Sequence, residues 1–305
     1  MKKEIKNVHI IGMGALGILY GKCIVDELGI DAVNFVVDEN RFDRYQNKQI
    51  SCNGEPCNFK VCKDKDAELT DLVIVAVKYT SLDSALETMK NSVGPNTIIM
   101  SVMNGISSEE IIAEKYGADK MIYTVAQGMD AMKFGDSLNF TKSGELRIGI
   151  IDSGLKENLD AVVEFLDKVS LAYTLETDIL YRMWGKFMLN VGVNQTCMVY
   201  ETNYSGVLNV SEYKRTFISA MREVIAIANA EDINLGEKDI NQYVEIIKSL
   251  SPTGVPSMAQ DRINHNHSEV EMFAGTVIKI ANKHNIHVPV NEFLYERVAE
   301  IEKEY

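Results

Sequence analysis

The chain is predicted to be an α/β protein in which an open, doubly wound parallel sheet is followed by an all-helical domain. Two features of its 305 residues predict this order. Over the first half, short apolar runs alternate with amphipathic segments, which is the pattern of successive strand–helix–strand units. From Asp178 onward, apolar residues recur at three- and four-residue intervals, the spacing of one face of a helix.

Four apolar runs in the first half have the length and composition of buried strands. They are Val8–Ile11, Val33–Val37, Leu72–Val77 and Thr97–Val102. Uninterrupted apolar runs of this length are typical of parallel strands that are covered on both faces. The apolar spacing of Ala15–Leu28 predicts a helix between the first two strands, and the charged stretch Asp38–Lys48 follows the second.

Two other segments are expected to be antiparallel. Ile50–Val61 has Asn53-Gly54 near its centre, a dipeptide preferred in two-residue hairpin turns, and therefore predicts a hairpin. After about residue 125 the segments become more polar and contain glycine. Among them, Lys142–Ile150 predicts antiparallel strand at the edge of a sheet.

The second half is expected to be helical throughout. Its helices are predicted over Ile179–Val199, Glu212–Glu231, Glu237–Leu250 and Glu269–His284, with Ser251-Pro252-Thr253-Gly254 as a break and Pro289 ahead of a last helix. A boundary near residues 170–180 then gives two domains, residues 1–176 and residues 177–305.

Composition points to a small-molecule partner. The net charge of −13 disfavours nucleic acid and an anionic membrane surface, because both are bound by clustered Lys and Arg. The 46% hydrophobic and 25% charged residues are typical of a globular protein with a sizeable core. The first 17 residues hold no long apolar run, so we expect neither a signal peptide nor a membrane span there, and a cytoplasmic protein.

No metal site is expected from the cysteines or histidines. The cysteines are Cys23, Cys52, Cys57, Cys62 and Cys197, and no C-x-x-C pair occurs among them, so reduced thiols are predicted. The histidines of the second half are His265, His267, His284 and His287. They lie among polar residues and are expected at the surface.

A glycine-rich turn follows the first expected strand and opens the first expected helix. Its residues Gly12-Met13-Gly14-Ala15-Leu16-Gly17 form G-x-G-x-x-G, the Rossmann-type dinucleotide-binding turn when it stands in this context. Gly12 permits the tight turn, Gly14 lets a pyrophosphate approach the helix N-terminus, and Gly17 lets the helix pack on the strand. All six are candidate cofactor-binding residues. The alternative is a glycine-rich turn without a ligand.

Two features that bear on the choice of dinucleotide conflict. Asp38 ends the second strand, 21 residues after Gly17, where an acid accepts hydrogen bonds from the ribose 2′-OH of NAD. Arg41 and Arg44 lie just beyond and could bind the 2′-phosphate of NADP. Alternatively, Asp38 only caps a helix and the arginines are exposed.

The helix expected over Ile179–Val199 carries a polar stripe on an otherwise apolar segment. Lys186, Asn190 and Asn194 are spaced at i, i+4 and i+8 and therefore share one face. A buried stripe of this kind is costly unless its groups are bonded. It indicates either a site for a polar ligand or a set of interhelical hydrogen bonds.

A second polar cluster lies further along the chain. It comprises Val255–Asp261, which includes Ser257, and then Ser268-Glu269 at the expected start of a helix. Taken alone, Ser257 could be an ordinary turn hydroxyl, and Ser268-Glu269 could be a capping arrangement.

Together these motifs resemble the ketopantoate reductase (2-dehydropantoate 2-reductase) family, and the likeness covers nearly the whole chain. The matching pieces are the N-terminal G-x-G-A-L-G, Val77-Lys78, Asn104-Gly105, Lys186-x-x-x-Asn190-x-x-x-Asn194, Pro256-Ser257-Met258-x-Gln260-Asp261, Ser268-Glu269 and Pro289-Val290-Asn291. Each piece is modest alone. Their shared order and spacing make the resemblance specific.

The resemblance implies a Rossmann domain, a helical domain and an active site in the cleft between them. It implies that Lys186 is the catalytic acid and that Asn104 contacts both cofactor and substrate. It also implies that the keto acid is bound by Asn190, Asn194 and Ser257, and that Lys78 and Glu269 lie on the cofactor side. The chemistry agrees, because hydride delivery to a 2-keto acid leaves charge on oxygen that an ammonium can stabilise and protonate.

The expected function is therefore reduction of 2-dehydropantoate to pantoate with NADPH, a step toward pantothenate and coenzyme A. NAD stays open, since Asp38 stands where the family usually has Arg, although Arg41 could substitute. One alternative is a reductase of another branched 2-keto acid to a D-2-hydroxy acid. Another is a non-catalytic dinucleotide sensor, against which Lys186 argues. A homodimer is one outcome for the oligomeric state, which the sequence leaves open.

Overall fold

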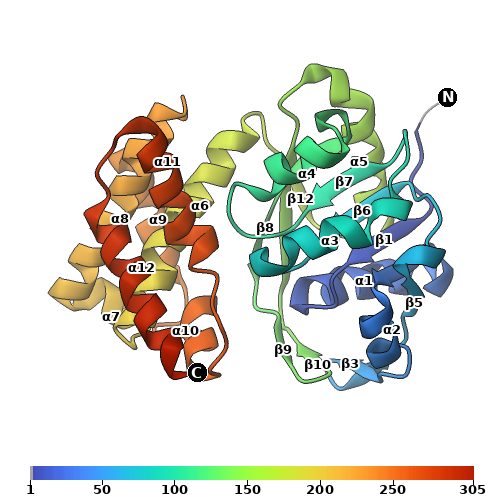
Figure 1. The fold of residues 1–305 in the computed structure, drawn as a ribbon, viewed down its shortest axis with the longest axis horizontal. Coiled ribbons are helices and arrows are strands. Elements are labelled where there is room, and N and C mark those ends of the chain that lie inside the picture. Colours follow the sequence, from blue (N-terminus) through green and yellow to red (C-terminus); the bar gives the residue numbers. More distant parts are fainter. Residues whose placement is uncertain (1–2) are drawn as a thin grey trace. The chain divides into compact units, whose positions relative to one another are not determined.

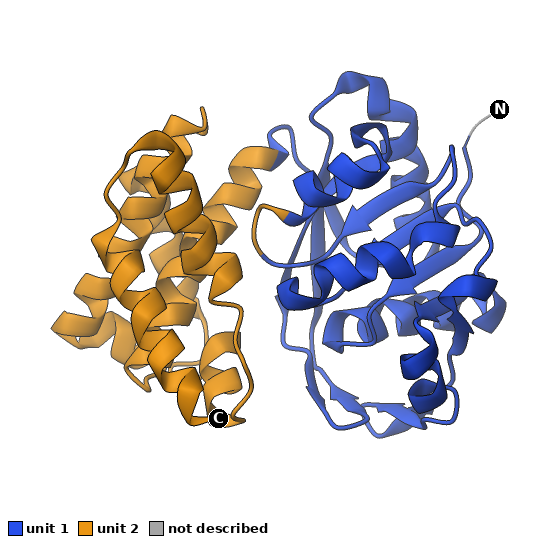
Figure 2. Ribbon diagram, viewed as in Figure 1, with its two compact units in different colours: residues 1–104, 108–179 blue, residues 105–107, 180–305 orange. Residues whose placement is uncertain are grey.

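The computed structural model describes residues 3–305. The first two residues of the N-terminal segment, in which neither a signal peptide nor a membrane span is expected, lie outside the described residues. The chain divides into two compact units (Figure 2). One contains residues up to 104 together with 108–179, and the other contains residues 105–107 and 180–305. The division after Ile179 differs by a few residues from the predicted boundary at 176/177. The short piece 105–107 was not expected to belong with the second unit.

The first unit is built on an eight-stranded sheet (Figure 1). In spatial order its strands are β12 (Tyr173–Leu175), β11 (Ser143–Gly149), β8 (Met121–Met129), β7 (Ile98–Ser101), β6 (Leu72–Val75), β1 (Val8–Ile11), β2 (Val33–Val37) and β5 (Lys60–Lys63). The six strands from β8 to β5 are parallel. Every residue of β1, β6 and β7 is buried, as expected for strands covered on both faces.

Five α-helices connect the strands of this unit. They are α1 (Ala15–Leu28), α2 (Glu39–Tyr45), α3 (Leu82–Thr88), α4 (Ser108–Tyr116) and α5 (Lys156–Lys168). The predicted bounds of α1 are confirmed, and its apolar face joins the main core, where Ile18, Leu19 and Ile24 are fully buried. Strand β2 lies on one side of β1, and β6, which comes later in the chain, lies on its other side. The strand order therefore reverses between β1 and β6. Such a switch point is where open α/β sheets bind ligands.

The predicted hairpin over Ile50–Val61 is only partly confirmed. Strands β3 (Ile50–Cys52) and β4 (Glu55–Cys57) pair antiparallel, and Asn53 and Gly54 have the positive φ angles, 50° and 84°, that a two-residue turn requires. Val61, however, belongs to β5, which pairs parallel with β2 in the large sheet. The pair β3–β4 instead extends into a separate small sheet with β10 (Ser137–Asn139) and β9 (Met132–Phe134).

The prediction for Lys142–Ile150 is confirmed in part: strand β11 is antiparallel to β8 on one side, but it pairs parallel with β12 on the other. The prediction that it forms a sheet edge is therefore wrong. The edge strand β12 is only three residues long and largely accessible, so it has no apolar pattern that the sequence could show. Strands β6 and β7 are also one or two residues shorter than predicted at their ends.

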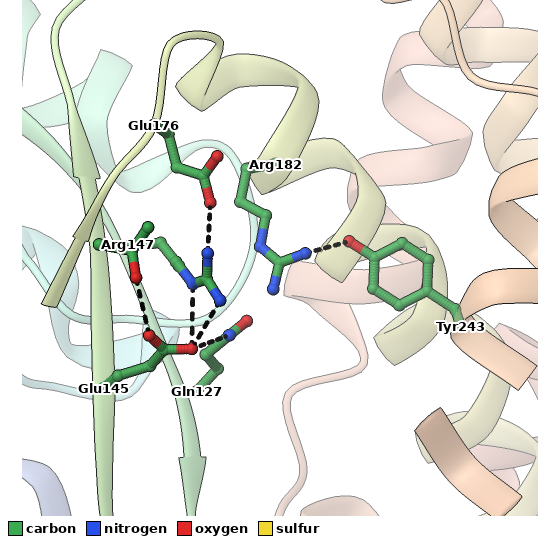
Figure 3. Close-up of polar contacts among 7 residues, drawn as sticks. Gln127, Glu145, Arg147, Glu176, Arg182 and Tyr243 are labelled. Atoms are coloured by element: carbon green, nitrogen blue, oxygen red, sulfur yellow. Dashed lines mark hydrogen bonds and ion pairs between the residues drawn. The ribbon is translucent and has the colours of Figure 1, made fainter. Parts of the chain in front are cut away.

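A half-buried network of hydrogen bonds and ion pairs links the strands at the β11–β12 end of the sheet (Figure 3). The Glu145 carboxylate accepts hydrogen bonds from Gln127 Nε2 at 2.8 Å, from Arg147 and from Thr174, and Arg147 also reaches Glu176 at 3.1 Å. Burial acts to raise the pKa of Glu145, but these hydrogen bonds outweigh it and hold the pKa below its ordinary value. The network therefore joins three neighbouring strands through one carboxylate.

The second unit is helical, as predicted. Its helices are α6 (Ile179–Val199), α7 (Tyr204–Asn209), α8 (Ser211–Ala230), α9 (Glu237–Ser249), α10 (Ser257–Ile263), α11 (Thr276–His284) and α12 (Pro289–Ile301). The predicted helix Glu269–His284 is α11 preceded by a wider π turn, Glu271–Gly275. Pro289 is the first residue of α12 rather than ahead of it, where its missing N–H costs nothing. Within residues 3–305, no helix combines the length and apolar character needed to span a membrane.

Asn291 ties three helices of this unit together. Its side chain is fully buried and lies between Gln195 of α6, at 3.3 Å, and Glu223 of α8, at 2.8 Å. Glu223 also accepts the backbone N–H groups of Val290 and Asn291 and so caps the start of α12. The Pro-Val-Asn motif noted in the sequence thus has a structural role here.

Replacing Asn291 with alanine is expected to lower the free energy of unfolding by about 2–4 kcal/mol, because it opens a small cavity and leaves Gln195 and Glu223 short of buried partners. Urea unfolding followed by circular dichroism measures this loss. Asn282→Ala, on the exposed face of α11, is the control and should change stability by less than about 0.5 kcal/mol. Equal stability of the two variants would remove the helix-joining role of Asn291.

Candidate functional site

Four predicted site positions lie at one edge of the large sheet. Gly12 follows β1, Asp38 follows β2, Lys78 lies just beyond β6 and Asn104 just beyond β7. These strands are neighbours and parallel, in the order β7-β6-β1-β2, so their carboxyl ends meet at the same edge. The structure therefore brings together, within the first unit, the residues that sequence analysis assigned to cofactor binding there. This edge includes the switch point between β1 and β6.

The glycine turn has the close backbone packing that its sequence predicts. Gly12 has φ +110°, and a Cβ there would lie 2.4 Å from the Ala76 carbonyl oxygen. A Cβ on Gly17 would lie 2.0 Å from the Gly12 carbonyl oxygen. Side chains are thus excluded at both positions, and the start of α1 is pressed against the β1 and β6 ends.

The start of α1 fits a pyrophosphate. Gly14 is the N-cap residue and provides no side chain to cap the helix, and the first turn holds no acidic residue. The first N–H groups of a 14-residue helix therefore lie at an electropositive terminus without an internal carboxylate to compete. Space remains around Gly14, whose nearest non-local atom to an added Cβ is 3.7 Å away. Residues 12–17 could hold the diphosphate of a nicotinamide dinucleotide.

Asp38 combines the two roles that sequence analysis set against each other. It is the N-cap of α2, where its Oδ1 accepts the backbone N–H of Arg41 at 2.9 Å. Its second oxygen pairs with the Arg41 guanidinium at 3.3 Å, and both side chains are more than a third exposed. A carboxylate with accessible oxygen thus stands at the end of β2, and Arg41 is held against it. Arg44, the other candidate for a 2′-phosphate, is exposed on α2.

Lys78 and Asn104 differ in their surroundings. Lys78 is exposed and precedes a short 3-10 turn, Tyr79–Ser81, whose last N–H bonds to the Lys78 carbonyl at 2.9 Å. Asn104 is half-buried in the turn between β7 and α4, directly after the buried Val102 and Met103. Both side chains make interactions in this structure. An ammonium and an amide at neighbouring strand ends are suited to the phosphate and carboxamide groups of a dinucleotide.

The helical unit holds the second group of predicted residues. Lys186, Asn190 and Asn194 follow one another along α6, and their exposure decreases along the stripe: Lys186 and Asn190 are half-buried, and Asn194 is 5% exposed. Asn194 donates to Asn190 Oδ1 at 3.4 Å. Around them Met183, Phe187 and Met188 are buried. The stripe is therefore a polar track set into an apolar helix.

Ser257 joins this stripe across the fold. Its hydroxyl donates to Asn194 Oδ1 at 2.9 Å, and the backbone N–H of Met258 donates to the same oxygen at 3.3 Å. Asn194 of α6 thus caps the start of α10, although it lies 63 residues earlier in the chain. This bond is one of the interhelical hydrogen bonds that were an alternative to a ligand site for the stripe. The exposed Ser257 hydroxyl and half-buried Asn190 remain polar groups at the accessible side of the stripe.

Glu269 is half-buried at the start of the π turn, where its carbonyl accepts from Met272 and Phe273. The neighbouring Ser268 donates its backbone N–H to Glu302 at 2.8 Å, so this corner is tied to the end of α12. The predicted role of Glu269 on the cofactor side stays a prediction.

None of these groups is a cysteine or a histidine, although Cys197 lies buried on α6, three residues after Asn194. Cys52 is buried and Cys57 half-buried in the β3–β4 hairpin, and burial together with the Cys57 thiol raises the pKa of Cys52 to about 12, which keeps it a thiol. His265, His267 and His287 are exposed, and His284 is half-buried against Glu231 at 2.6 Å. Among residues 3–305, no group of three or more His, Cys, Asp or Glu is arranged to hold a metal ion.

A buried polar group that was not predicted from the sequence lies on either side of Asn104 in the chain. It consists of Ser101 at the end of β7 and Ser108-Glu109 at the start of α4, and all three side chains are buried. A carboxylate in the first turn of a helix is ordinarily exposed, so the sequence offered only the pair Ser108-Glu109 after Asn104-Gly105 as an indication. The Glu109 carboxylate is buried because the connection between β7 and α4 is short.

Family comparison agrees with this arrangement over both units. Residues 8–153 match the model of the family described as "Ketopantoate reductase PanE/ApbA", and residues 178–302 match "Ketopantoate reductase PanE/ApbA C terminal". The chain belongs to the ketopantoate reductase family. It is accordingly an oxidoreductase of the 2-dehydropantoate 2-reductase family, whose members serve pantothenate biosynthesis.

The curated relatives of this ketopantoate reductase family member are distant but full-length. It is 26% identical over 310 residues to a 2-dehydropantoate 2-reductase of Lactococcus lactis subsp. lactis (strain IL1403), covering 95% of this chain and 96% of that protein. It is 25% identical to the enzyme of Aquifex aeolicus (strain VF5), covering 95% and 94%. The predicted family is therefore confirmed, while the substrate is not fixed at this identity.

Solved structures confirm the fold. The ternary structure of D-mandelate dehydrogenase with NADH and anilino(oxo)acetate has a TM-score of 0.87 at 20% identity, covering 98% of both chains. The 2-dehydropantoate 2-reductase from Geobacter metallireducens GS-15 has a TM-score of 0.83 at 21% identity, covering 96% of this chain and 99% of that one. The fold is thus shared by reductases with different names.

Proposed function

We propose that this ketopantoate reductase family member reduces 2-dehydropantoate to pantoate with a reduced nicotinamide dinucleotide. The observation that carries the proposal is the pairing of two features in one chain. One is the uncapped, acid-free start of α1 behind a turn that excludes side chains at Gly12 and Gly17. The other is the Lys186–Asn190–Asn194 stripe with Ser257 bonded to it.

The residues of the helical unit have chemistry suited to a 2-keto acid. When bound, the reduced nicotinamide supplies a hydride to C2 of the keto acid. Lys186 carries the ammonium that donates the proton to the carbonyl oxygen, which becomes the hydroxyl of the product. Asn190 offers an amide N–H donor for the carboxylate. The Ser257 hydroxyl is held by Asn194, to which it donates its one proton, so it donates to the substrate only after turning away from Asn194 Oδ1.

The choice of dinucleotide depends on Asp38. The resemblance implied NADP, with NAD left open. The cap geometry favours NADH, because Asp38 is locked at the end of β2 with accessible carboxylate oxygen, and the nearby Arg41 is engaged by that same carboxylate. A 2′-phosphate at this position would meet the negative charge of Asp38 and would have to separate the Asp38–Arg41 pair.

A second keto acid is considered because of the fold likeness to D-mandelate dehydrogenase, whose TM-scores of 0.87 and 0.88 exceed that of the Geobacter metallireducens enzyme. That protein's name describes an enzyme of an aromatic 2-hydroxy acid. The polar stripe of α6 serves either substrate equally, because both present the same carboxylate and ketone. The side chains that contact the remainder of the substrate decide between them.

Initial rates test the proposal. Oxidation of NADH and of NADPH is followed by the loss of absorbance of the reduced nicotinamide, with 2-dehydropantoate, with 2-ketoisovalerate and with benzoylformate, the keto acid of mandelate. We expect kcat/KM to be highest for 2-dehydropantoate and higher with NADH than with NADPH. Preference for benzoylformate would transfer the assignment to a D-2-hydroxy acid dehydrogenase. Dinucleotide binding without turnover of any keto acid would favour the sensor.

A homodimer is the proposed assembly. Its support is the fold likeness, with a TM-score of 0.80 at 21% identity, to a ketopantoate reductase from Staphylococcus aureus whose structure is described as dimeric. Sedimentation equilibrium measures the mass of the assembly directly, against 34.1 kDa for one chain. A single species of that mass would show a monomer.

A further inference from the structure

A directed chain of hydrogen bonds connects a buried carboxylate to the turn that carries Asn104. Ser108 Oγ donates to Glu109 Oε2 at 2.7 Å. Because the Ser108 proton is used in that bond, Ser101, whose Oγ lies 2.8 Å from Ser108 Oγ, must be the donor between the two hydroxyls. Ser101 Oγ in turn accepts the backbone N–H of Met103 at 3.4 Å. Met103 immediately precedes Asn104.

Glu109 is buried without a cationic partner among the groups that act on it. Its side chain is 1% exposed, and its carboxylate also receives hydrogen bonds from the backbone N–H groups of Glu109 and Thr124. Burying a carboxylate costs free energy. Here that cost is offset because the carboxylate accepts hydrogen bonds from the donors around it. The position lies in the first turn of α4, where the helix terminus favours negative charge.

We propose that Glu109 is a positioning residue for the reductase reaction: through Ser108 and Ser101 it sets the backbone of the turn that presents Asn104 to the nicotinamide and the keto acid. The inference rests on the proposed function and on the contact with cofactor and substrate that the family resemblance implies for Asn104. Glu109 itself does not touch substrate or dinucleotide. Its effect is transmitted through two hydroxyls and one backbone N–H.

Protonation of Glu109 changes the direction of this chain. Burial raises the pKa of Glu109 to about 7, against an ordinary value of 4.5, although its hydrogen bonds act in the opposite sense. The ionised carboxylate can only accept, which orders the two hydroxyls toward it. The carboxylic acid can donate to Ser108, which then donates to Ser101, and the Ser101 proton has to find another acceptor. The turn is therefore held in the described arrangement above about pH 7.

Few ionisable groups act on this site. Glu110, next to it on α4, raises the pKa further, and Tyr123 on β8 has its own pKa raised by burial and by the charges of Glu109 and Glu110. The contacts from β7 come from the Ser101 hydroxyl. A change in activity near neutral pH that depends on Glu109 can therefore be assigned by substitution.

Three variants test the proposal by steady-state kinetics between pH 5.5 and 8.5 (roughly the window around a pKa near 7). Glu109→Ala is expected to lower kcat about tenfold while leaving the Kd of the dinucleotide within about twofold, since misplacement alone costs rate. Glu109→Gln keeps an acceptor for Ser108 and should restore most of that loss, but it removes the fall in kcat below pH 7. Ser101→Ala breaks the chain without altering charge and should resemble Glu109→Ala.

Glu114→Gln, exposed on the same helix, is the control and should keep both kcat and its pH dependence. Melting temperatures of the variants establish that they are folded. If Glu109→Ala and Ser101→Ala are folded and match the wild type in kcat and in pH profile, the positioning role is overturned. A fall below pH 7 that persists in Glu109→Gln also overturns it, because the titrating group then lies elsewhere.

NMR separates this inference from the proposed function. With 13C-labelled glutamate and 15N-labelled backbone, the Glu109 carboxyl and the Met103 and Asn104 amides should titrate with one common midpoint near pH 7. This coupling is measured whether or not any keto acid is reduced. Absence of a shared midpoint overturns the hydrogen-bond coupling, whereas a shared midpoint without turnover would leave the coupling intact and contradict only the reaction.

Discussion

Replacement of Lys186 by methionine is expected to lower kcat by about 10²-fold or more while dinucleotide affinity is retained. The range is that of general acid catalysis by one positioned side chain. Methionine keeps the length and the apolar stem of lysine, and the neighbours on α6, Met183 and Phe187, are buried and apolar. The helix should therefore stay packed. Rates with saturating dinucleotide and keto acid, together with calorimetric titration of the dinucleotide, measure the two quantities separately.

Lys248→Met provides the matched control for the loss of one lysine. Lys248 lies on α9, is half exposed and pairs with Glu245 at the surface, so its removal should leave kcat unchanged. Turnover that survives in Lys186→Met would make Lys186 a structural member of the α6 stripe, and another group would have to protonate the product oxygen. Loss of dinucleotide affinity in the same variant would instead place Lys186 in cofactor binding.

The parts of the fold that the sequence predicted are those with strong periodicity. Helix α6 has its predicted bounds, and so do β1, α1 and β2, because long apolar runs and a glycine turn leave few alternatives. Short elements escaped prediction for a physical reason. Strand β12 has three residues with partly accessible side chains, so tertiary pairing with β11 rather than its composition makes it a strand. The π turn 271–275 likewise has no pattern of its own.

The candidate site, like the fold, was predicted only in part from the sequence. The positions after β1, β2, β6 and β7 were predicted because parallel topology carries strand ends to one edge. The bond between Asn194 and Ser257 spans 63 residues, and periodicity within one helix cannot indicate which distant hydroxyl meets it. The chain from Glu109 to Met103 depends on burial of a first-turn carboxylate, which only packing of α4 on the sheet decides.

Asp38→Asn is expected to reverse the preference between the dinucleotides. The change removes the charge and keeps an oxygen that can still accept the Arg41 N–H at the start of α2, so the helix cap is retained. Loss of a charged acceptor for the ribose hydroxyls should weaken NADH, and removal of repulsion should favour NADPH. A contribution of about 1.5–3 kcal/mol for a hydrogen bond to a charged group corresponds to a change of roughly 10–150-fold in the ratio of kcat/KM values.

Arg41 is the reason why Asp38→Asn should shift the preference toward NADPH. In the wild type the Asp38 carboxylate occupies Arg41 at 3.3 Å, whereas in Asp38→Asn the guanidinium is released and becomes available to a 2′-phosphate. Asp43→Asn, an exposed site on the same helix, makes an equal change in net charge and should leave the ratio as it is. If the wild type already prefers NADPH and Asp38→Asn leaves that preference unchanged, Asp38 acts as a helix cap alone. Arg41 must then reach the phosphate while still paired, and the family's usual dinucleotide is retained despite the acid at the end of β2.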